Sequence, residues 1–315
     1  MSLKSAVWNP EEKRPRTPIR VIAGVIILAV VTALFMIPPL FVLSILDVAL
    51  LATAGLGLAL FTTGLSGIAS IAGVWLAGRY VDRRRFADFG LGIDREWWVD
   101  CVFGLALGGL LMTGIFLVQL AAGWIEVRAV FAGEALLWVV VGSLLLFIIV
   151  GIYEELLLRG YLLTNLAEGA RGPLGIGGAI AFATIASSLA FGALHASNPN
   201  ATLVSTLSIS FAGVMLALGY VLTGELAIPI GLHVTWNLFQ GTVYGFPVSG
   251  LDFGASLVDI EQGGPTAATG GSFGPEAGLL GFGAMVAACL LTVWWVRWRY
   301  GSVEIDDSVA VPELR

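Results

Sequence analysis

Long apolar segments recur along this chain, each near the roughly 20 residues that a helix needs to cross a bilayer. Leu136–Gly151 (LLWVVVGSLLLFIIVG) contains no charged residue at all. Of the 315 residues, 57% are hydrophobic and only 12% are charged. A water-soluble domain has no means of covering so much apolar sequence, so the composition predicts an all-α, polytopic membrane protein.

Eight apolar segments are the predicted membrane-spanning helices of one bundle. The fourth is expected to continue as a helix to Asn165, because no strong helix breaker occurs before the predicted loop at Gly169–Pro173. The predicted transmembrane domain covers 21–298, with a core at about 79–244. The eight segments are approximately Val21–Pro38, Ala52–Gly78 (after a short apolar segment around Asp47), Val99–Ala122, Leu136–Tyr153, Gly175–His195, Leu203–Thr223, Leu226–Tyr244 and Leu279–Val296.

Basic residues predict the orientation, because cytoplasmic loops accumulate Lys and Arg. With eight spans and a cytoplasmic N-terminal arm (1–20), only Arg128 among the basic residues falls outside the cell. We therefore expect a multi-pass protein of the cell membrane with both termini cytoplasmic, including the tail 299–315. Gly245–Gly274 is expected to be an external loop. The basic residues placed inside are Lys4, Lys13, Arg14, Arg16, Arg20, the arginines of Arg79–Arg95, Arg159, Arg171, Arg297, Arg299 and Arg315.

Two adjacent carboxylates, Glu154 and Glu155, follow the fourth apolar segment directly in the sequence GIYEELLLRGY. An ionisable group at such a depth costs about 2.5–3.5 kcal/mol on insertion scales and usually serves a site or a pathway. Glu155 and Arg159 are four residues apart, so they share a helix face and predict an ion pair. Glu154 points about 100° away and has no local partner.

The chain has only two histidines, and both lie in or at the end of an apolar segment. His195 ends FGALH, and His233 begins HVTWN, where it shares a helix face with Asn237. For a single such histidine, a packing role in the core would be as good an explanation as a catalytic role. Together with Glu154, however, the two imidazoles and the carboxamide form a set that can accept protons and donate hydrogen bonds. Water activation and oxyanion stabilisation need both abilities.

Three motifs occur in a fixed order and use both histidines. The sequence resembles the CPBP (CAAX protease and bacteriocin-processing, or Abi) family of intramembrane proteases, which includes the CAAX prenyl endopeptidases. The resemblance covers about Arg79–Asn237. The motifs are EExxxR at Glu154, Glu155 and Arg159, FxxxH at Phe191 and His195, and HxxxN at His233 and Asn237.

The resemblance implies a glutamate-dependent endopeptidase that cuts a membrane-associated peptide or protein. Glu154 would be the general base and would hold the attacking water together with His195. His233 and Asn237 would stabilise the oxyanion, while Glu155 and Arg159 would support the site. Lipidated substrates are one option that this resemblance leaves open, and no nucleic-acid partner is expected.

A divalent metal such as zinc is an open question at this stage. Glu154, His195 and His233 could supply three ligands. The chain has no HExxH motif, however, and these ligands come from three separate helices, so no metal is required for the chemistry. The two cysteines, Cys101 and Cys289, lie at or within apolar spans and do not predict a zinc site.

Two further classes compete with a protease: an ion- or proton-coupled transporter that uses the same charges, and a non-catalytic membrane scaffold. Two aromatic residues in or near the motifs have simpler predicted roles. Phe191 is expected to pack, and Tyr161 to lie at the membrane interface. The predicted loop at Gly169–Pro173 leaves Glu154 and His195 about 10 Å apart in depth, counted at 1.5 Å per residue.

Overall fold

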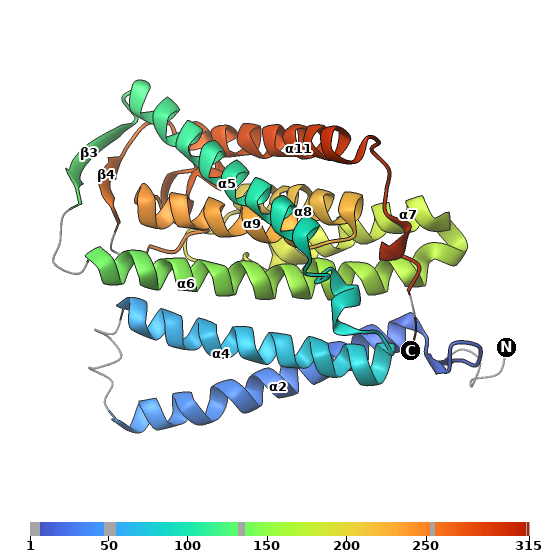
Figure 1. The fold of residues 1–315 in the computed structure, drawn as a ribbon. Coiled ribbons are helices and arrows are strands. Elements are labelled where there is room, and N and C mark those ends of the chain that lie inside the picture. The colour runs from blue at the N-terminus through green and yellow to red at the C-terminus, as the bar shows by residue number, and fades with distance from the viewer. Residues whose placement is uncertain (1–6, 47–54, 132–135, 253–255, 313, 315) are drawn as a thin grey trace.

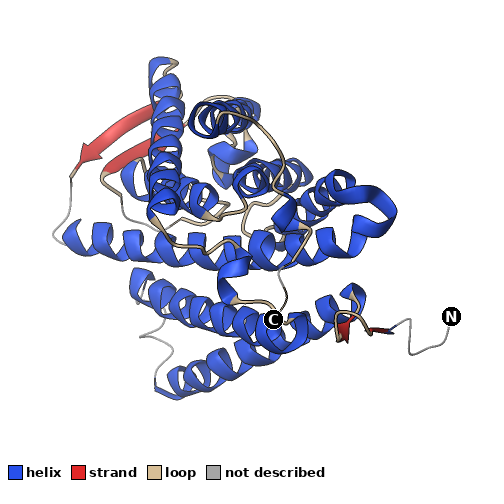
Figure 2. Cartoon of the chain, turned by 45° about the vertical axis from the view of Figure 1, so that its right-hand side comes forward, coloured by secondary structure: helices blue, strands red, loops and turns tan. Residues whose placement is uncertain are grey.

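The computed structural model describes residues 7–46, 55–131, 136–252, 256–312 and 314, and it is an all-α bundle (Figures 1 and 2). Three of its helices continue as π-helical segments. The main helices are α2 (Thr17–Leu46), α4 (Gly55–Leu76) with η1 (Ala77–Asp82), α5 (Arg95–Ala121), α6 (Leu136–Glu155) with η3 (Leu156–Leu163), α7 (Thr164–Leu194), α8 (Leu203–Thr223), α9 (Ala227–Asn237) with η4 (Leu238–Val243), and α11 (Leu279–Tyr300).

Six helical segments among the described residues are long and apolar enough to cross a membrane. One of them, Leu137–Leu194, contains two passes, because the helix breaks at Gly175. The predicted span Leu226–Tyr244 corresponds to α9 and η4, which are shorter and largely buried among the other helices. The predicted polytopic bundle of about eight helices is therefore confirmed.

The turn between the fourth and fifth passes lies further along the chain than we expected. The helix continues through Pro173, and the break comes at Gly175, with φ 68° and ψ 173°. Glycine adopts a positive φ without the steric cost of a Cβ atom. Glu154 and His195 each lie about 20 residues from this turn, so the depth mismatch of about 10 Å disappears.

Helix α9 lies inside the bundle, with α5 on one side and α6 on another (Figure 1). Glycines allow the close contact with α5. A Cβ atom at Gly104 would lie 2.3 Å from the Ile228 carbonyl oxygen, and one at Gly231 would lie 2.3 Å from that of Cys101. The two backbones therefore touch, which fixes the position of α9. The Cys101 thiol is free and buried beside this contact.

The layers are clear in both views: α2 and α4 form a pair on one side of α6, and α5, α8, α9 and α11 lie on the other (Figures 1 and 2). A two-stranded antiparallel sheet of β3 (Ile125–Val130) and β4 (Val258–Gln262) caps one end of the bundle. The beginning of α2 and the end of α11 lie at the other end (Figure 1).

The expectation of a plain loop over Gly245–Gly274 is wrong. Besides β4, the segment contains the short helix α10 (Thr266–Thr269) and the 3-10 turn η5 (Gly271–Phe273), and it is followed by the 3-10 turn η6 (Pro275–Ala277). Residues 253–255 of this segment, the stretch around Asp47, and Lys4 lie outside the described residues.

The described part of the N-terminal arm is packed against the bundle rather than extended in solvent. It forms a hairpin of β1 (Trp8–Asn9) and β2 (Arg14–Pro15). The side chains of Arg14, Arg20 and Arg84 are buried and all pair with Glu168, Arg20 at 2.8 Å and Arg84 at 2.7 Å. Arg84, which we interpreted only as a topology signal, therefore also joins the segment after η1 to α7.

Candidate functional site

Helix α6 brings the two motif glutamates against α9. A Cβ atom at Gly151 would lie 2.7 Å from the Val234 side chain, so glycine lets the two helices approach closely at this point. Three residues later, Glu154 and Glu155 face the histidine of α9. The π-helical segment η3 begins directly after Glu155.

Glu155 is the centre of a buried ion network. Its carboxylate accepts a hydrogen bond from Arg159 at 2.9 Å and another from Nδ1 of His233 at 2.8 Å, and both Glu155 and Arg159 are fully buried. Arg159 also donates to the Gly213 carbonyl of α8 at 3.1 Å. The predicted Glu155–Arg159 pair is thus present, and it joins three helices through Arg159 and His233.

Glu154 points away from this network into a cavity, as the helical spacing predicts. The Tyr153 hydroxyl donates to one of its oxygens at 3.2 Å. The other oxygen, Oε2, lies 3.9 Å from Nε2 of His233 and is buried without a hydrogen-bond partner among the described residues. Buried polar atoms are nearly always satisfied. This oxygen is therefore positioned to accept a proton or a hydrogen bond from a molecule inside the cavity.

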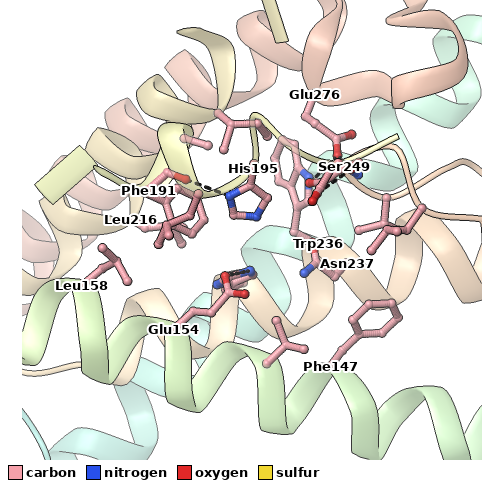
Figure 3. A pocket seen from close by; sticks show the side chains of 18 of the residues that line it. Phe147, Glu154, Leu158, Phe191, His195, Leu216, Trp236, Asn237, Ser249 and Glu276 are labelled. Carbon is pink, nitrogen blue, oxygen red and sulfur yellow. Dashed lines mark hydrogen bonds and ion pairs between the residues drawn. The ribbon is translucent and has the colours of Figure 1, made fainter. Parts of the chain in front are cut away.

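His195 occupies the C-cap position of α7 and faces Glu154 across the same space (Figure 3). Its Nδ1 lies 2.8 Å from the Phe191 carbonyl oxygen. A carbonyl oxygen can only accept, so Nδ1 carries the proton and the neutral ring has its lone pair on Nε2. The same reasoning holds for His233, whose Nδ1 donates to Glu155. Both neutral rings thus have an acceptor nitrogen at Nε2.

A cavity of about 500 Å³ lies between these helices, and Glu154, His195, His233 and Asn237 all line it. Figure 3 shows the side chains of Glu154, His195 and Asn237 directed into the same space. The structure therefore brings together the four residues that the sequence singled out. Apolar side chains, among them Leu146 and Phe147 of α6, line other parts of the cavity.

Phe191 does more than fill space. Its ring lies under the Arg159 guanidinium, 4.5 Å from ring centroid to Cζ, and contacts the His195 ring at 4.7 Å between centroids. It therefore links the ion network to His195. Tyr161, by contrast, is not interfacial: it is buried, and its hydroxyl donates to the Arg20 carbonyl. The widened turns of η3 also remove it from the face of Glu154.

The sequence-based prediction missed several polar residues of the cavity, among them Asn198, Ser249 and Glu276. Glu276 lies in η6 and is only 2% exposed. It accepts hydrogen bonds from the backbone N–H and the hydroxyl of Ser249 and from the Gln240 amide. Burial raises the pKa of Glu276 to about 7. The sequence feature that could have identified Glu276 is its position as an isolated acidic residue, in FGPEAG, directly before an apolar segment.

The geometry does not match a metal site. No three His, Cys, Asp or Glu side chains in the described part of the chain are grouped closely enough to hold a metal ion. Glu154, His195 and His233 line one cavity but do not form such a group.

Comparison with known proteins points to the same part of the chain. Residues 136–239 match the family model of type II CAAX prenyl endopeptidase Rce1-like proteins. The uncharacterized protein YyaK of Bacillus subtilis (strain 168) is 27% identical over 187 residues, which are 56% of this chain and 60% of YyaK. No solved structure matches the chain. The matched region contains all three motifs, and it is similar to the type II CAAX prenyl endopeptidase Rce1-like family, as the resemblance predicted.

Proposed function

We propose that this protein is an intramembrane endopeptidase of the CAAX-processing type, which hydrolyses a peptide bond with water activated by Glu154. The observation that carries the proposal is the unpartnered, buried Oε2 of Glu154. It faces a cavity that is also lined by His195, His233 and Asn237. Glu155 also has a buried Oε2 without a partner, but its Oε1 already accepts from Arg159 and His233, and Glu155 is not part of the cavity lining.

Glu154 and His195 share the water in this mechanism. Glu154 takes one proton from the water, and Nε2 of His195 accepts the other hydrogen, so that an oxygen lone pair is directed at the substrate carbonyl carbon. Proton transfer needs heavy-atom distances of about 2.6–3.2 Å, so the shared water has to lie within this range of both residues. The proton held by Glu154 then passes to the leaving amide nitrogen as the C–N bond breaks.

Asn237 and His233 are the proposed donors to the oxyanion. The Asn237 amide can donate as it stands, whereas His233 donates from Nε2 in its protonated form. Glu155 holds the other nitrogen of that ring at 2.8 Å and so fixes its orientation. Glu155 and Arg159 thus act as positioning residues, because they act through His233. No step of this scheme passes through a metal.

The substrate is proposed to be a membrane-associated peptide or protein, and lipidation remains part of that proposal. Both termini are proposed to be cytoplasmic. In support, the basic segment 79–95 and the end of α11 lie at the same end of the bundle as the start of α2 (Figure 1). Arg159 no longer contributes to this argument, because it is buried in the ion network.

A cleavage assay tests the proposal. The purified protein is reconstituted in liposomes with a library of membrane-anchored peptides, and the products are identified by mass spectrometry. Glu154→Gln and His195→Gln should abolish cleavage without loss of thermal stability. Glu304→Gln, a matched change at an exposed glutamate in the tail, should leave it unchanged. Normal cleavage by both site variants would refute the mechanism, and failure of the native protein to cut any peptide would favour the transporter interpretation.

A further inference from the structure

A second, smaller cavity lies where α4 passes into η1, at the same end of the bundle as the start of α2 (Figure 1). Its volume is about 80 Å³. Since one water occupies about 30 Å³ of liquid, this cavity has room for a group of the size of a phosphate but not for an acyl chain. Its lining shares no residue with the three motifs and consists of Trp75, Gly78, Arg79, Arg84, Phe86 and Phe89.

Arg79 brings to this cavity a positive charge that no carboxylate of the described residues neutralises. The Cζ atom of its guanidinium lies 5.9 Å from the ring centroid of Trp75 and 5.7 Å from that of Tyr80. The acidic residues that follow in the sequence, Asp82 and Asp88, pair with other arginines. The two aromatic rings therefore hold the Arg79 guanidinium in place and leave its net charge intact.

Arg84 adds a hydrogen-bond donor to the same cavity. Its side chain is buried, and its Nη2 pairs with Glu168 at 2.7 Å, so most of its charge is already balanced. Its Nε, however, is buried and has no hydrogen-bond partner among the described residues. Buried polar atoms are nearly always satisfied. A phosphate oxygen is a suitable acceptor for this N–H, because guanidinium donors match the geometry of phosphate.

An exposed apolar face of α4 leads to this cavity from the middle of the membrane helix. Ile68, Ile71 and Trp75 are 54%, 38% and 43% exposed, and their spacing of three and four residues places them on one face of the helix. Trp75 and Tyr80 are exposed aromatic residues next to the cavity, as is typical of the headgroup level of a membrane. An acyl chain that lies along this face has its headgroup beside Arg79.

We propose that this cavity binds the phosphate group of an anionic phospholipid whose acyl chains lie along Ile68, Ile71 and Trp75. The apolar face favours a lipid over a soluble phosphate ion, because a soluble ion gains nothing from that face. The uncancelled charge of Arg79 favours an anionic lipid over a zwitterionic one, since the ammonium group of the latter would be repelled by the guanidinium. The site is independent of the proposed protease function.

Lipid titrations followed by native mass spectrometry test the proposal. The purified full chain in detergent is titrated with phosphatidylglycerol, with phosphatidylcholine of the same acyl chains, or with inorganic phosphate. We expect phosphatidylglycerol to bind about fivefold more tightly than phosphatidylcholine, which is the preference that one arginine near an anionic lipid provides. Inorganic phosphate should bind far more weakly than either lipid.

Three variants check the cause of the preference. Arg79→Gln should reduce the affinity for phosphatidylglycerol about fivefold and leave the affinity for phosphatidylcholine nearly unchanged. Arg79→Lys, which keeps the charge, should retain most of the preference. Arg95→Gln removes the same charge at an exposed position outside the cavity lining and should have no effect. Because Arg79 is exposed and has no ion pair among the described residues, all three variants should keep the native Tm in the absence of added lipid.

The results that would overturn the proposal are distinct. Equal affinities for the two lipids, or an equal loss of phosphatidylglycerol binding in Arg79→Gln and Arg95→Gln, would show that no specific anionic site exists here. Inorganic phosphate that binds as tightly as phosphatidylglycerol would assign the cavity to a soluble anion and would refute the lipid site. A loss of preference in Arg79→Gln that Arg79→Lys largely restores would support the proposal.

Discussion

Glu155→Gln is the change whose effect the structure predicts most fully. The glutamine keeps the size of the side chain and removes only the charge. In the native protein the Glu155 carboxylate pairs with Arg159 at 2.9 Å and with His233 at 2.8 Å. Neither Glu155 nor Arg159 is exposed to solvent there. The substitution therefore leaves an arginine buried without its counter-charge.

The expected loss of stability follows from the burial of the unpaired arginine. Removing one partner of a buried ion pair typically destabilises a protein by about 3–5 kcal/mol, because the remaining charge is uncompensated. With an unfolding entropy of about 2.1 cal/mol/K per residue over the chain, this corresponds to a fall of about 5–8 °C in Tm. Activity should also fall beyond the effect of stability, since His233 loses the acceptor that orients its ring.

A double-mutant cycle measures the pair in the purified protein by thermal unfolding. Arg159→Gln added to Glu155→Gln should recover part of the lost stability, because no unpaired charge then remains buried. The coupling free energy should exceed the ~0.5 kcal/mol within which independent changes add. Glu304→Gln is the control for the loss of a glutamate as such. Additive effects in the cycle, or a stable Glu155→Gln variant, would refute the account of the network.

Three further predictions concern packing, pH and topology. Gly104→Ala should destabilise the protein by about 1–3 kcal/mol, because its Cβ atom would lie 2.3 Å from the Ile228 carbonyl oxygen. Gly114→Ala, on the same helix with nothing within 4 Å, is the control, and equal Tm values would be inconsistent with the packing argument. The pKa of Glu276 is about 7 in the folded protein, compared with its usual value of 4.5, so between these two values the folded protein binds a proton that the unfolded chain has lost. The free energy of unfolding should therefore decrease as pH rises through that window, by on the order of 3 kcal/mol. Glu276→Gln should flatten that part of the curve of stability against pH, and an unchanged curve would count against the raised pKa. Cysteines introduced at the exposed positions Ser308 and Ser272 should label from inside and outside the cell respectively, and the reverse pattern would overturn the proposed orientation.

The parts of the site that could be predicted from sequence depend on short-range spacing. Glu155 and Arg159 pair because residues four apart share a helix face, and Glu154 diverges for the same reason. Motif order was sufficient to group Glu154, His195 and His233, although three different helices supply them. The approximate number of helices in the bundle could be predicted from the apolar segments of membrane length.

The remaining features depend on contacts that no local pattern encodes. Pro173 looks like a stronger helix breaker than Gly175, yet the chain turns where a positive φ is available. The π-helical segment η3 changes the face of Tyr161 without a sequence signal. Glu276 enters the cavity only because the segment containing Ser249 folds back onto it, and β3 pairs with β4 across more than 120 residues of chain.

The central claim is that Glu154 activates water for direct attack on a peptide bond. Single-turnover cleavage in water enriched in oxygen-18, followed by mass spectrometry of the product and of the peptide that contains Glu154, tests it most directly. We predict one heavy oxygen in the new carboxylate of the product, none in Glu154, and no product from Glu154→Gln. Heavy oxygen in Glu154 with an unlabelled first product, or normal product formation by Glu154→Gln, would contradict the claim.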